Sequence, residues 1–184
     1  ESEFYFPMNS ANSFALAKLL TDHRNSYQGR RKPQHQLASR VQLPAYKKLK
    51  GMMHGFIDLV FCFQGRYYVC DYKSSHLGDS FEDYLGPALI ENMEKNYYDL
   101  QYLIYLLALH RYLKNVLPDY DPDRHLGGVY YLYLRGMTNI EKYRYCGVFY
   151  RKVDTKELAL LDEIFTGGKN EEDTQALMGE SDAS

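Results

Sequence analysis

Apolar and aromatic residues cluster in the middle of the chain in a pattern that predicts two adjacent β-strands. Residues 50–63 and 66–73 are rich in β-branched and aromatic side chains, which favour strands. Only Gln64 and Gly65 separate the two stretches, and a two-residue loop can close a hairpin. The pattern therefore predicts an antiparallel hairpin with a tight turn at these two residues.

Each predicted strand carries one acidic residue among apolar neighbours. If Phe63 pairs with Arg66 across the turn, Asp58 lies directly opposite Asp71. Two like charges at opposed positions destabilise a sheet, so a positive group is expected between them. A divalent cation fits this position, and Lys73 projects from the same face as Asp71. The alternative is that Asp58 only ends a strand and that Asp71 pairs with Lys73 or a nearby arginine.

Elsewhere the spacing of apolar residues predicts helices and two further strands. The expected helices cover residues 12–20, 81–96 with a break at Gly86–Pro87, 99–116 and 155–165, with caps at Ser10 or Asn12, at Asp99 and at Asp154. The expected strands cover residues 129–134 and 143–150, and residues 21–40 are expected to form a polar loop. One domain is expected over residues 1–166, followed by a disordered acidic tail at 167–184.

The overall charge does not indicate a free-standing DNA-binding protein. The formal net charge is −2, whereas nucleic-acid-binding domains are usually basic. Positive charge is nevertheless concentrated in residues 24–50, which contain Arg24, Arg30, Arg31, Lys32, Arg40, Lys47, Lys48 and Lys50. This basic segment is either an arm that follows phosphates or a solvated loop. The 19 tyrosines suit sheet surfaces and base stacking equally well, so their number alone decides nothing.

Cysteine usage and the lack of targeting signals predict a cytoplasmic location. Three cysteines cannot form a fully paired disulfide framework. Cys62 and Cys70 do not face each other in the predicted hairpin, and they are expected to be buried, reduced thiols. The acidic start of the sequence does not resemble a signal peptide. The apolar run at residues 103–109 is too short to span a bilayer, so no membrane association is expected.

Three motifs occur in order along the chain. Gly55-x-Ile57-Asp58 is followed by Asp71-Tyr72-Lys73-Ser74 and then by Gln101 and Tyr105, which three residues separate. Together with the stretch 127–136, these motifs resemble the RecB-like nucleases of the PD-(D/E)xK superfamily. The likeness is close over residues 50–136 and looser elsewhere. It implies an α/β, restriction-endonuclease-like fold, with a mixed central sheet flanked by helices.

The resemblance also implies a set of catalytic and metal-binding residues. Asp58, Asp71 and the backbone carbonyl of Tyr72 would hold Mg²⁺, for which Mn²⁺ can substitute. Asp58, Asp71 and Lys73 would be the catalytic residues. Lys73 would position the attacking water or stabilise negative charge in the transition state.

Two further residues are assigned to the site by the same resemblance. Gln101 and Tyr105 lie at positions i and i+4 and therefore share a helix face. In RecB-like nucleases such residues line the active site and contact the DNA backbone. Without the resemblance, Tyr105 would be assigned to the core and Gln101 to the edge of a strand.

The function implied by the resemblance is that of an exodeoxyribonuclease domain within a helicase–nuclease, ATP-dependent in the full complex and active in DNA recombination and repair. Its partners would be DNA and RecC- and RecD-like subunits. Motor domains would deliver the strand, which would explain how an acidic module handles an anionic substrate. The alternative is a nuclease-like fold that docks or holds DNA with little or no catalysis.

One feature departs from the RecB-like pattern. Those nucleases carry a metal-binding histidine on a helix upstream of the first acidic strand, but the expected helix at 12–20 has no histidine. His23 and His35 lie in sequence predicted to be a polar loop, and His54 would lie about 13 Å from Asp58 along a strand. The chain is therefore expected to lack the first nuclease helix and one metal ligand, and to be weakly active alone.

Overall fold

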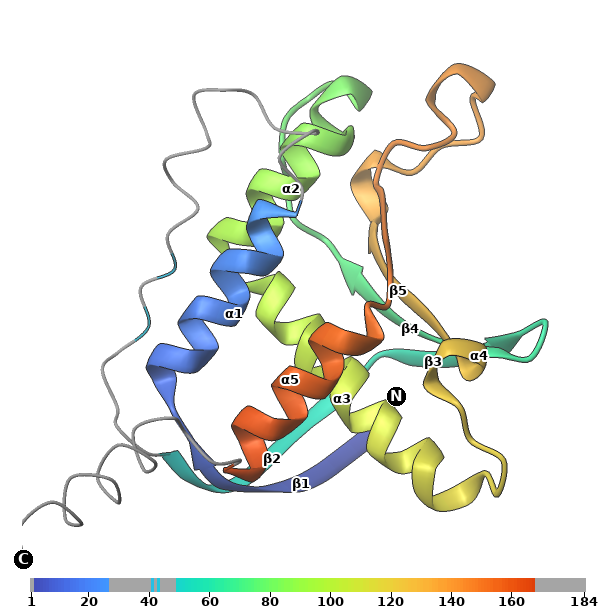
Figure 1. Ribbon diagram of the computed structural model, residues 1–184. Helices are drawn as coiled ribbons and strands as arrows, with labels where there is room; N and C mark the ends of the chain where they lie inside the picture. Colours follow the sequence, from blue (N-terminus) through green and yellow to red (C-terminus); the bar gives the residue numbers. More distant parts are fainter. Residues whose placement is uncertain (1, 27–40, 42, 44–48, 168–184) are drawn as a thin grey trace, which may run out of the picture.

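The structure, a computed structural model, describes residues 2–26, 41, 43 and 49–167 (Figure 1). The strands are β1 (Ser2–Ala11), β2 (Leu49–Ile57), β3 (Leu59–Phe63), β4 (Arg66–Lys73), β5 (Leu126–Tyr133) and β6 (Val148–Lys152). The helices are α1 (Ser13–Asn25), α2 (Gly86–Lys95), α3 (Tyr98–Val116), α4 (Pro122–His125) and α5 (Thr155–Thr166). Short 3₁₀ turns lie at Phe81–Tyr84, Leu134–Gly136 and Glu141–Tyr143.

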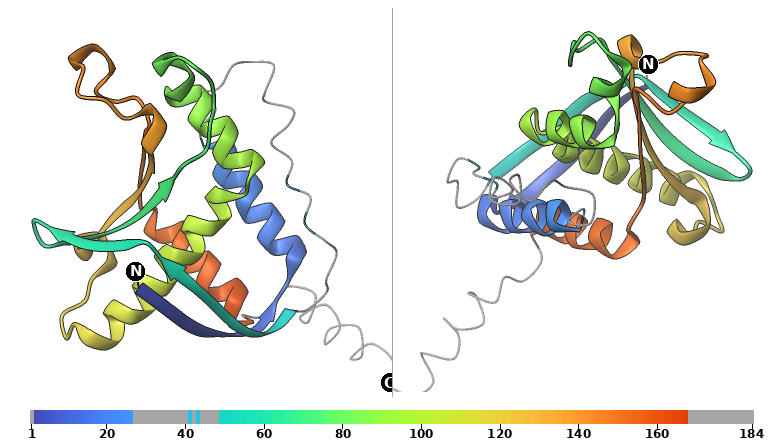
Figure 2. Two further views of the ribbon diagram at one scale, coloured as in Figure 1. Left: turned by 180° about the vertical axis from the view of Figure 1, so that it is seen from behind. Right: turned by 90° about the horizontal axis from the view of Figure 1, so that it is seen from above.

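The main sheet has the strand order β3-β4-β5-β6, in which β4 and β5 are parallel and the outer pairs are antiparallel. Because parallel neighbours need a crossover connection, the chain passes from β4 through α2 and α3 before it returns in β5. Figures 1 and 2 show α1, α2, α3 and α5 gathered on one side of this sheet. The mixed sheet with flanking helices confirms the expected α/β, restriction-endonuclease-like class.

The predicted two-residue hairpin turn is confirmed, with Phe63 and Arg66 closing it as expected. Phe63 pairs with Arg66, and β3 and β4 continue in this register as far as Leu59. The backbone angle φ is 50° at Gln64 and 75° at Gly65. Positive φ at both central residues is typical of the type I′ turn, whose twist matches that of the flanking strands.

The predicted single strand over residues 50–63 is wrong, because the chain bends at Asp58 and forms two strands. β2 pairs with β1, and only β3 continues the hairpin with β4. The strand β1 was not predicted, although its inward Phe6 is 4% exposed and its outward Tyr5 is 60% exposed. Pro7 argues against a strand in sequence, but it is tolerated because β1 is paired on one edge only.

Helix α1 begins where predicted but ends later. The side chain of Asn12 accepts a hydrogen bond from the backbone N–H of Phe14 at 2.8 Å, which is the expected N-cap. The predicted end at Leu20 is wrong, since the helix continues to Asn25. The last turn carries His23 and Arg24, which are polar but buried. Their partners lie on distant segments, so a local reading of the sequence cannot find them.

Arg24 and Asp99 form a buried ion pair between α1 and α3. The guanidinium Nε lies 2.5 Å from Asp99 Oδ2, and both side chains are at most 5% exposed. The prediction that Asp99 caps α3 is therefore wrong, because the cap position is Tyr97, whose φ is 54°. Because it is buried in this ion pair, Arg24 does not contribute to the predicted basic segment on the surface. Of that segment Lys50 is exposed on β2, whereas Arg30, Arg31, Lys32, Arg40, Lys47 and Lys48 lie outside the described residues.

The boundaries of β5 and β6 differ from the prediction. β5 begins at Leu126 rather than at residue 129, and β6 begins at Val148 rather than at residue 143. Tyr143 and its neighbours have strand-like composition, but they form a 3₁₀ turn. Gly147 ends this connection with φ at 74°, and its N–H donates to the carbonyl of Tyr84 at 2.8 Å.

The remaining helix predictions are largely confirmed. The chain breaks before Gly86, where α2 begins, after the 3₁₀ turn at Phe81–Tyr84. Asp154 caps α5 by accepting hydrogen bonds from Lys156 N at 3.0 Å and Glu157 N at 3.2 Å. The predicted acidic tail lies outside the described residues beyond Gly167.

The cysteines are all free, but one prediction about them is wrong. Cys62 is exposed on β3, whereas Cys70 and Cys146 are buried. Burial raises the pKa of the Cys70 thiol to about 11. Across residues 2–26 and 49–167, no helix has the length and apolar character needed to cross a membrane.

Candidate active site

The end of β4 places a carboxylate and an ammonium side by side. Asp71 and Lys73 are two residues apart, so their side chains project from the same face of the strand. Lys73 Nζ lies 2.6 Å from Asp71 Oδ2. Asp71 is only 4% exposed. The structure therefore brings together the two residues that the sequence analysis placed on one face.

Asp58 reaches the same strand from the bend between β2 and β3. Its Oδ2 accepts a hydrogen bond from the backbone N–H of Tyr72 at 2.9 Å. The ladder between β3 and β4 stops at Leu59, so Asp58 is not itself a paired position. The predicted direct pairing of Asp58 with Asp71 is therefore wrong, but the bend leaves the charge of Asp58 close enough to Asp71 to raise its pKa.

The Asp71 carboxylate is buried, and burial disfavours its charged form. Burial raises the pKa of Asp71 above its ordinary range, the nearby Lys73 opposes this shift, and the charge of Asp58 adds to it. Its Oδ2 is paired with the Lys73 ammonium, which lies 2.6 Å away. The raised pKa shows that one ammonium compensates the buried charge only in part, and a bound cation would favour the ionised carboxylate further.

Helix α3 supplies a hydrogen-bonded pair next to Lys73. Gln101 Nε2 donates to the Tyr105 hydroxyl at 2.8 Å, which confirms that the two side chains share a helix face. Gln101 Oε1 in turn accepts from Lys73 Nζ at 3.3 Å. Burial, together with the charge of Asp71, raises the pKa of Tyr105 to about 12. Tyr105 is 7% exposed, so it belongs to the core and to the site at once.

Two tyrosines around Lys73 were missed by the sequence analysis. The ammonium lies 4.0 Å from the centre of the Tyr98 ring and 5.1 Å from that of Tyr131. The Tyr131 hydroxyl also donates to Gln101 Oε1 at 2.8 Å. Tyr98 precedes Gln101 by three residues on α3, and Tyr131 pairs with Asp71 across β4 and β5. The i, i+3 spacing of Tyr98 and Gln101 is a signal that could have identified Tyr98 from the sequence.

The described residues offer few side chains that could ligate a metal ion. Within the described ranges, no group of three or more His, Cys, Asp and Glu side chains could hold a metal ion. Two carboxylates and a carbonyl still suit Mg²⁺, which keeps several waters and needs only one or two protein carboxylates. The carboxylate of Asp71 fits this use, because burial and the charge of Asp58 raise its pKa and a bound cation would favour its ionised form.

The described histidines do not supply a further ligand. The prediction that His23 lies in a loop is wrong, since it is buried on α1 between the Tyr102 hydroxyl and Glu157. His54 lies on β2 and contacts Glu3 at 2.9 Å. His35 lies outside the described residues.

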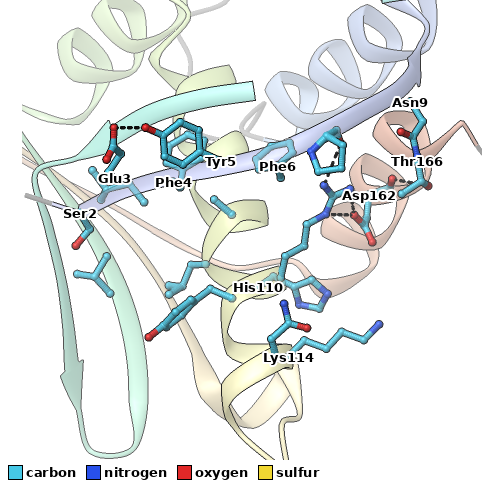
Figure 3. Close-up of a pocket in the computed structure, with 18 residues that line it drawn as sticks. Ser2, Glu3, Phe4, Tyr5, Phe6, Asn9, His110, Lys114, Asp162 and Thr166 are labelled. Atoms are coloured by element: carbon cyan, nitrogen blue, oxygen red, sulfur yellow. Dashed lines mark hydrogen bonds and ion pairs between the residues drawn. The ribbon is translucent and has the colours of Figure 1, made fainter. Parts of the chain in front are cut away.

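A cavity of about 1050 Å³ is lined by neither Asp58 nor Asp71. Figure 3 shows residues of its wall. The cavity opens between β1, the second half of α3 and α5, with His110 and Lys114 on its wall. Phe4 links the cavity to the site, because its ring packs edge-on against Tyr105 with the ring centres 5.7 Å apart. His110 is not free in this cavity, since its Nδ1 lies 2.8 Å from the Tyr120 hydroxyl.

Comparison with known proteins gives a family for this arrangement. The chain matches the model of the PD-(D/E)XK nuclease superfamily over residues 10–177. It is 45% identical over 135 residues to the RecBCD enzyme subunit RecB of Haemophilus influenzae, which covers 71% of this chain and 11% of that protein. The RecB subunit of Escherichia coli is 44% identical over 127 residues, which covers 69% of this chain and 11% of that protein.

A more distant relative agrees with these two. The RecB subunit of Mycobacterium tuberculosis is 41% identical over 126 residues, which covers 66% of this chain. The chain spans only 11 to 12% of the length of these curated relatives. The family model nevertheless matches most of the chain, and it includes both strands that carry the acidic residues. The chain is therefore a RecB-type member of the PD-(D/E)XK nuclease superfamily.

Proposed function

We propose that this chain is the metal-dependent DNA nuclease domain of a RecB-type helicase–nuclease, and that it hydrolyses phosphodiester bonds in DNA recombination and repair. The observation that carries the proposal is the convergence of Asp71 and Lys73 on one face of β4, with Asp58 beside them at a bend. In the complete enzyme we expect an ATP-dependent exodeoxyribonuclease in the cytoplasm, with RecC- and RecD-like subunits as partners.

In this proposal Asp58, Asp71 and the backbone carbonyl of Tyr72 hold Mg²⁺, and Mn²⁺ can replace it. The bound ion supplies a Lewis acid that neutralises phosphate charge and lowers the pKa of a water ligand. The protein contributes two carboxylates whose positions are fixed before the ion binds. Asp58 is held by the N–H of Tyr72, and Asp71 is held by Lys73.

Lys73 is proposed to position the attacking water or to stabilise charge that develops on the phosphate. Its compact ammonium suits this task, and Asp71, Gln101 and Tyr98 hold it in place. Gln101 and Tyr105 are proposed to contact the DNA backbone. Because Gln101 also binds Lys73, a strand seated on α3 would be coupled to the catalytic ammonium.

A second candidate function is a nuclease-like module that docks or holds DNA with weak or no catalysis. The observation that favours it is the small number of metal-ligating side chains within the described residues. The two candidates differ in whether the carboxylates bind a divalent ion, so metal binding is the experiment that separates them.

We expect Mn²⁺ to bind between Asp58 and Asp71. Asp71→Asn should lower the Mn²⁺ affinity measured by calorimetry by at least about tenfold, because the loss of even an outer partner of a metal ligand costs 10- to 100-fold. The control is Asp119→Asn, an exposed carboxylate outside the site, which should bind as the wild type does.

Crystals soaked in Mn²⁺ give an independent measurement. Anomalous density should lie between the two carboxylates. Oxygens of Asp58 and Asp71 more than about 8 Å apart could not share one ion, since Mg²⁺–oxygen bonds are about 2.0–2.1 Å long. Such a separation, or equal affinity of Asp71→Asn and wild type, would contradict the metal assignment.

A further inference from the structure

The main sheet has a second face, opposite to the one that carries Asp71 and Lys73. Paired residues share a face, so the register defines this outer face by residues 59, 61 and 63 of β3 and 66, 68, 70 and 72 of β4, with 128, 130 and 132 of β5 and 148, 150 and 152 of β6. The long helices α1, α2, α3 and α5 lie on the other side (Figures 1 and 2). The short helix α4 touches the outer face at Arg66, whose Nη1 donates to the carbonyl of Asp123.

A row of aromatic rings crosses the outer face, with one ring from each strand. Phe61 stacks on Tyr68 with ring centres 5.1 Å apart, and Tyr68 lies 5.9 Å from Tyr130. Tyr130 then lies 4.7 Å from Tyr150. The row is therefore continuous across β3, β4, β5 and β6.

The backbone beneath the row is shaped to admit these rings. A side chain at Gly127 would place its Cβ 2.3 Å from the Tyr68 ring, and one at Gly128 would lie 2.3 Å from the carbonyl oxygen of Arg151 and 3.0 Å from the Tyr150 ring. The two glycines leave the space that the rings occupy. Tyr150 remains 42% exposed, so its ring is open to a ligand.

The charge of the outer face is of one sign. By the register above it carries Arg66 and Lys152 and no aspartate or glutamate. Arg66 is held in place because its Nη1 donates to the carbonyls of Asp123 and Leu126. An anionic ligand with flat apolar groups complements such a surface.

The outer face begins at the candidate active site. Tyr72 projects from it and is 44% exposed, while its neighbours Asp71 and Lys73 project from the catalytic face. The N–H of the same residue donates to Asp58. Tyr72 therefore lies between the carboxylates and the aromatic row of the outer face.

We propose that the outer face holds single-stranded DNA, whose bases stack on Tyr130 and Tyr150 and whose phosphates contact Lys152 and Arg66. Stacking on aromatic side chains, combined with positive charge along the backbone, is a general mode of sequence-independent single-strand binding. The inference rests on the proposed nuclease function for the identity of the polymer. It adds a holding surface that is separate from the catalytic residues.

The test uses the full chain in EDTA and a fluorescein-labelled oligothymidylate of about 20 nucleotides, longer than typical single-strand sites. Fluorescence anisotropy gives the dissociation constant. Tyr130→Leu and Tyr150→Leu should each weaken binding about fivefold or more, the usual effect of removing one stacking platform. Tyr150→Phe keeps the ring and should bind as the wild type does. Lys152→Gln should lower the log–log salt slope by about 0.7.

The controls are an exposed tyrosine and an exposed lysine on helices of the other side. Tyr112→Leu on α3 and Lys18→Gln on α1 should leave both the affinity and the salt slope unchanged. Circular dichroism verifies the fold of each variant. If a leucine variant is unfolded, Lys152→Gln still decides the outcome, because it alters an exposed side chain only.

Three results would overturn the inference. The first is a wild-type chain that does not bind the oligonucleotide. The second is equal binding by wild type, Tyr130→Leu, Tyr150→Leu and Lys152→Gln. The third is unchanged oligonucleotide binding together with loss of assembly with RecC- or RecD-like subunits, which would make the face a protein interface. Cleavage is measured in a separate experiment with Asp71→Ala. If the nuclease proposal fails there, the binding results can still be interpreted, because they do not depend on cleavage.

Discussion

Asp71→Ala and Lys73→Ala should each reduce DNA cleavage by the complete RecB-type enzyme by at least about 100-fold. The loss of one preorganised charged group at a developing charge typically costs 10²–10³ in rate. Asp71 is buried and contacts Lys73 at 2.6 Å, so either substitution removes a charge and also releases its partner. The rate at which acid-soluble nucleotide is released from labelled duplex DNA measures cleavage.

ATP-driven unwinding provides the internal control for this experiment. It should continue at the wild-type rate, because the substituted residues lie in the nuclease domain. Lys156→Ala removes an exposed lysine from the first turn of α5 and should leave cleavage unchanged. Wild-type cleavage by either active-site variant would refute the assigned roles of Asp71 and Lys73.

The largest effect on stability is expected at the ion pair between α1 and α3. Asp99→Ala leaves the Arg24 guanidinium buried without its carboxylate, and the loss of one partner of a buried pair costs about 3–5 kcal/mol. The pair is nearly inaccessible, and Arg24 also donates to the carbonyl of Glu94 at 2.9 Å. Urea denaturation followed by circular dichroism should show a lower free energy of unfolding.

A double substitution and an exposed pair serve as controls. Arg24→Met with Asp99→Leu removes both charges and should cost less than Asp99→Ala, since apolar replacement of a buried pair is often tolerated. Glu141→Ala disrupts the exposed pair with Arg144 and should change the free energy of unfolding little. Equal stability of Asp99→Ala and wild type would show that the buried pair is not a major contributor.

Features that depend on a few neighbouring residues could be predicted from sequence. The two-residue turn at Gln64 and Gly65 sets the register of β3 and β4 as far as Leu59. The shared helix face of Gln101 and Tyr105 follows from their i, i+4 spacing. In each case the residues that decide the structure lie close together in the chain.

Features that depend on distant partners could not be predicted in this way. Arg24 and Asp99 are far apart in sequence, yet their contact extends α1 past Leu20 and removes Asp99 from the cap of α3. A polar last turn is stable in the interior because it is paired there. Its composition alone indicates a loop.

The sequence by itself determined the family motifs, the hairpin and the face that carries Asp71 and Lys73. Tertiary structure decided the bend at Asp58, because β1 pairs with β2 while β4 pairs with β3. It also decided the aromatic surroundings of Lys73, which come from α3 and β5. Side-chain alternation predicts which residues share a face of a strand. The residues that this face contacts depend on how distant elements pack against it.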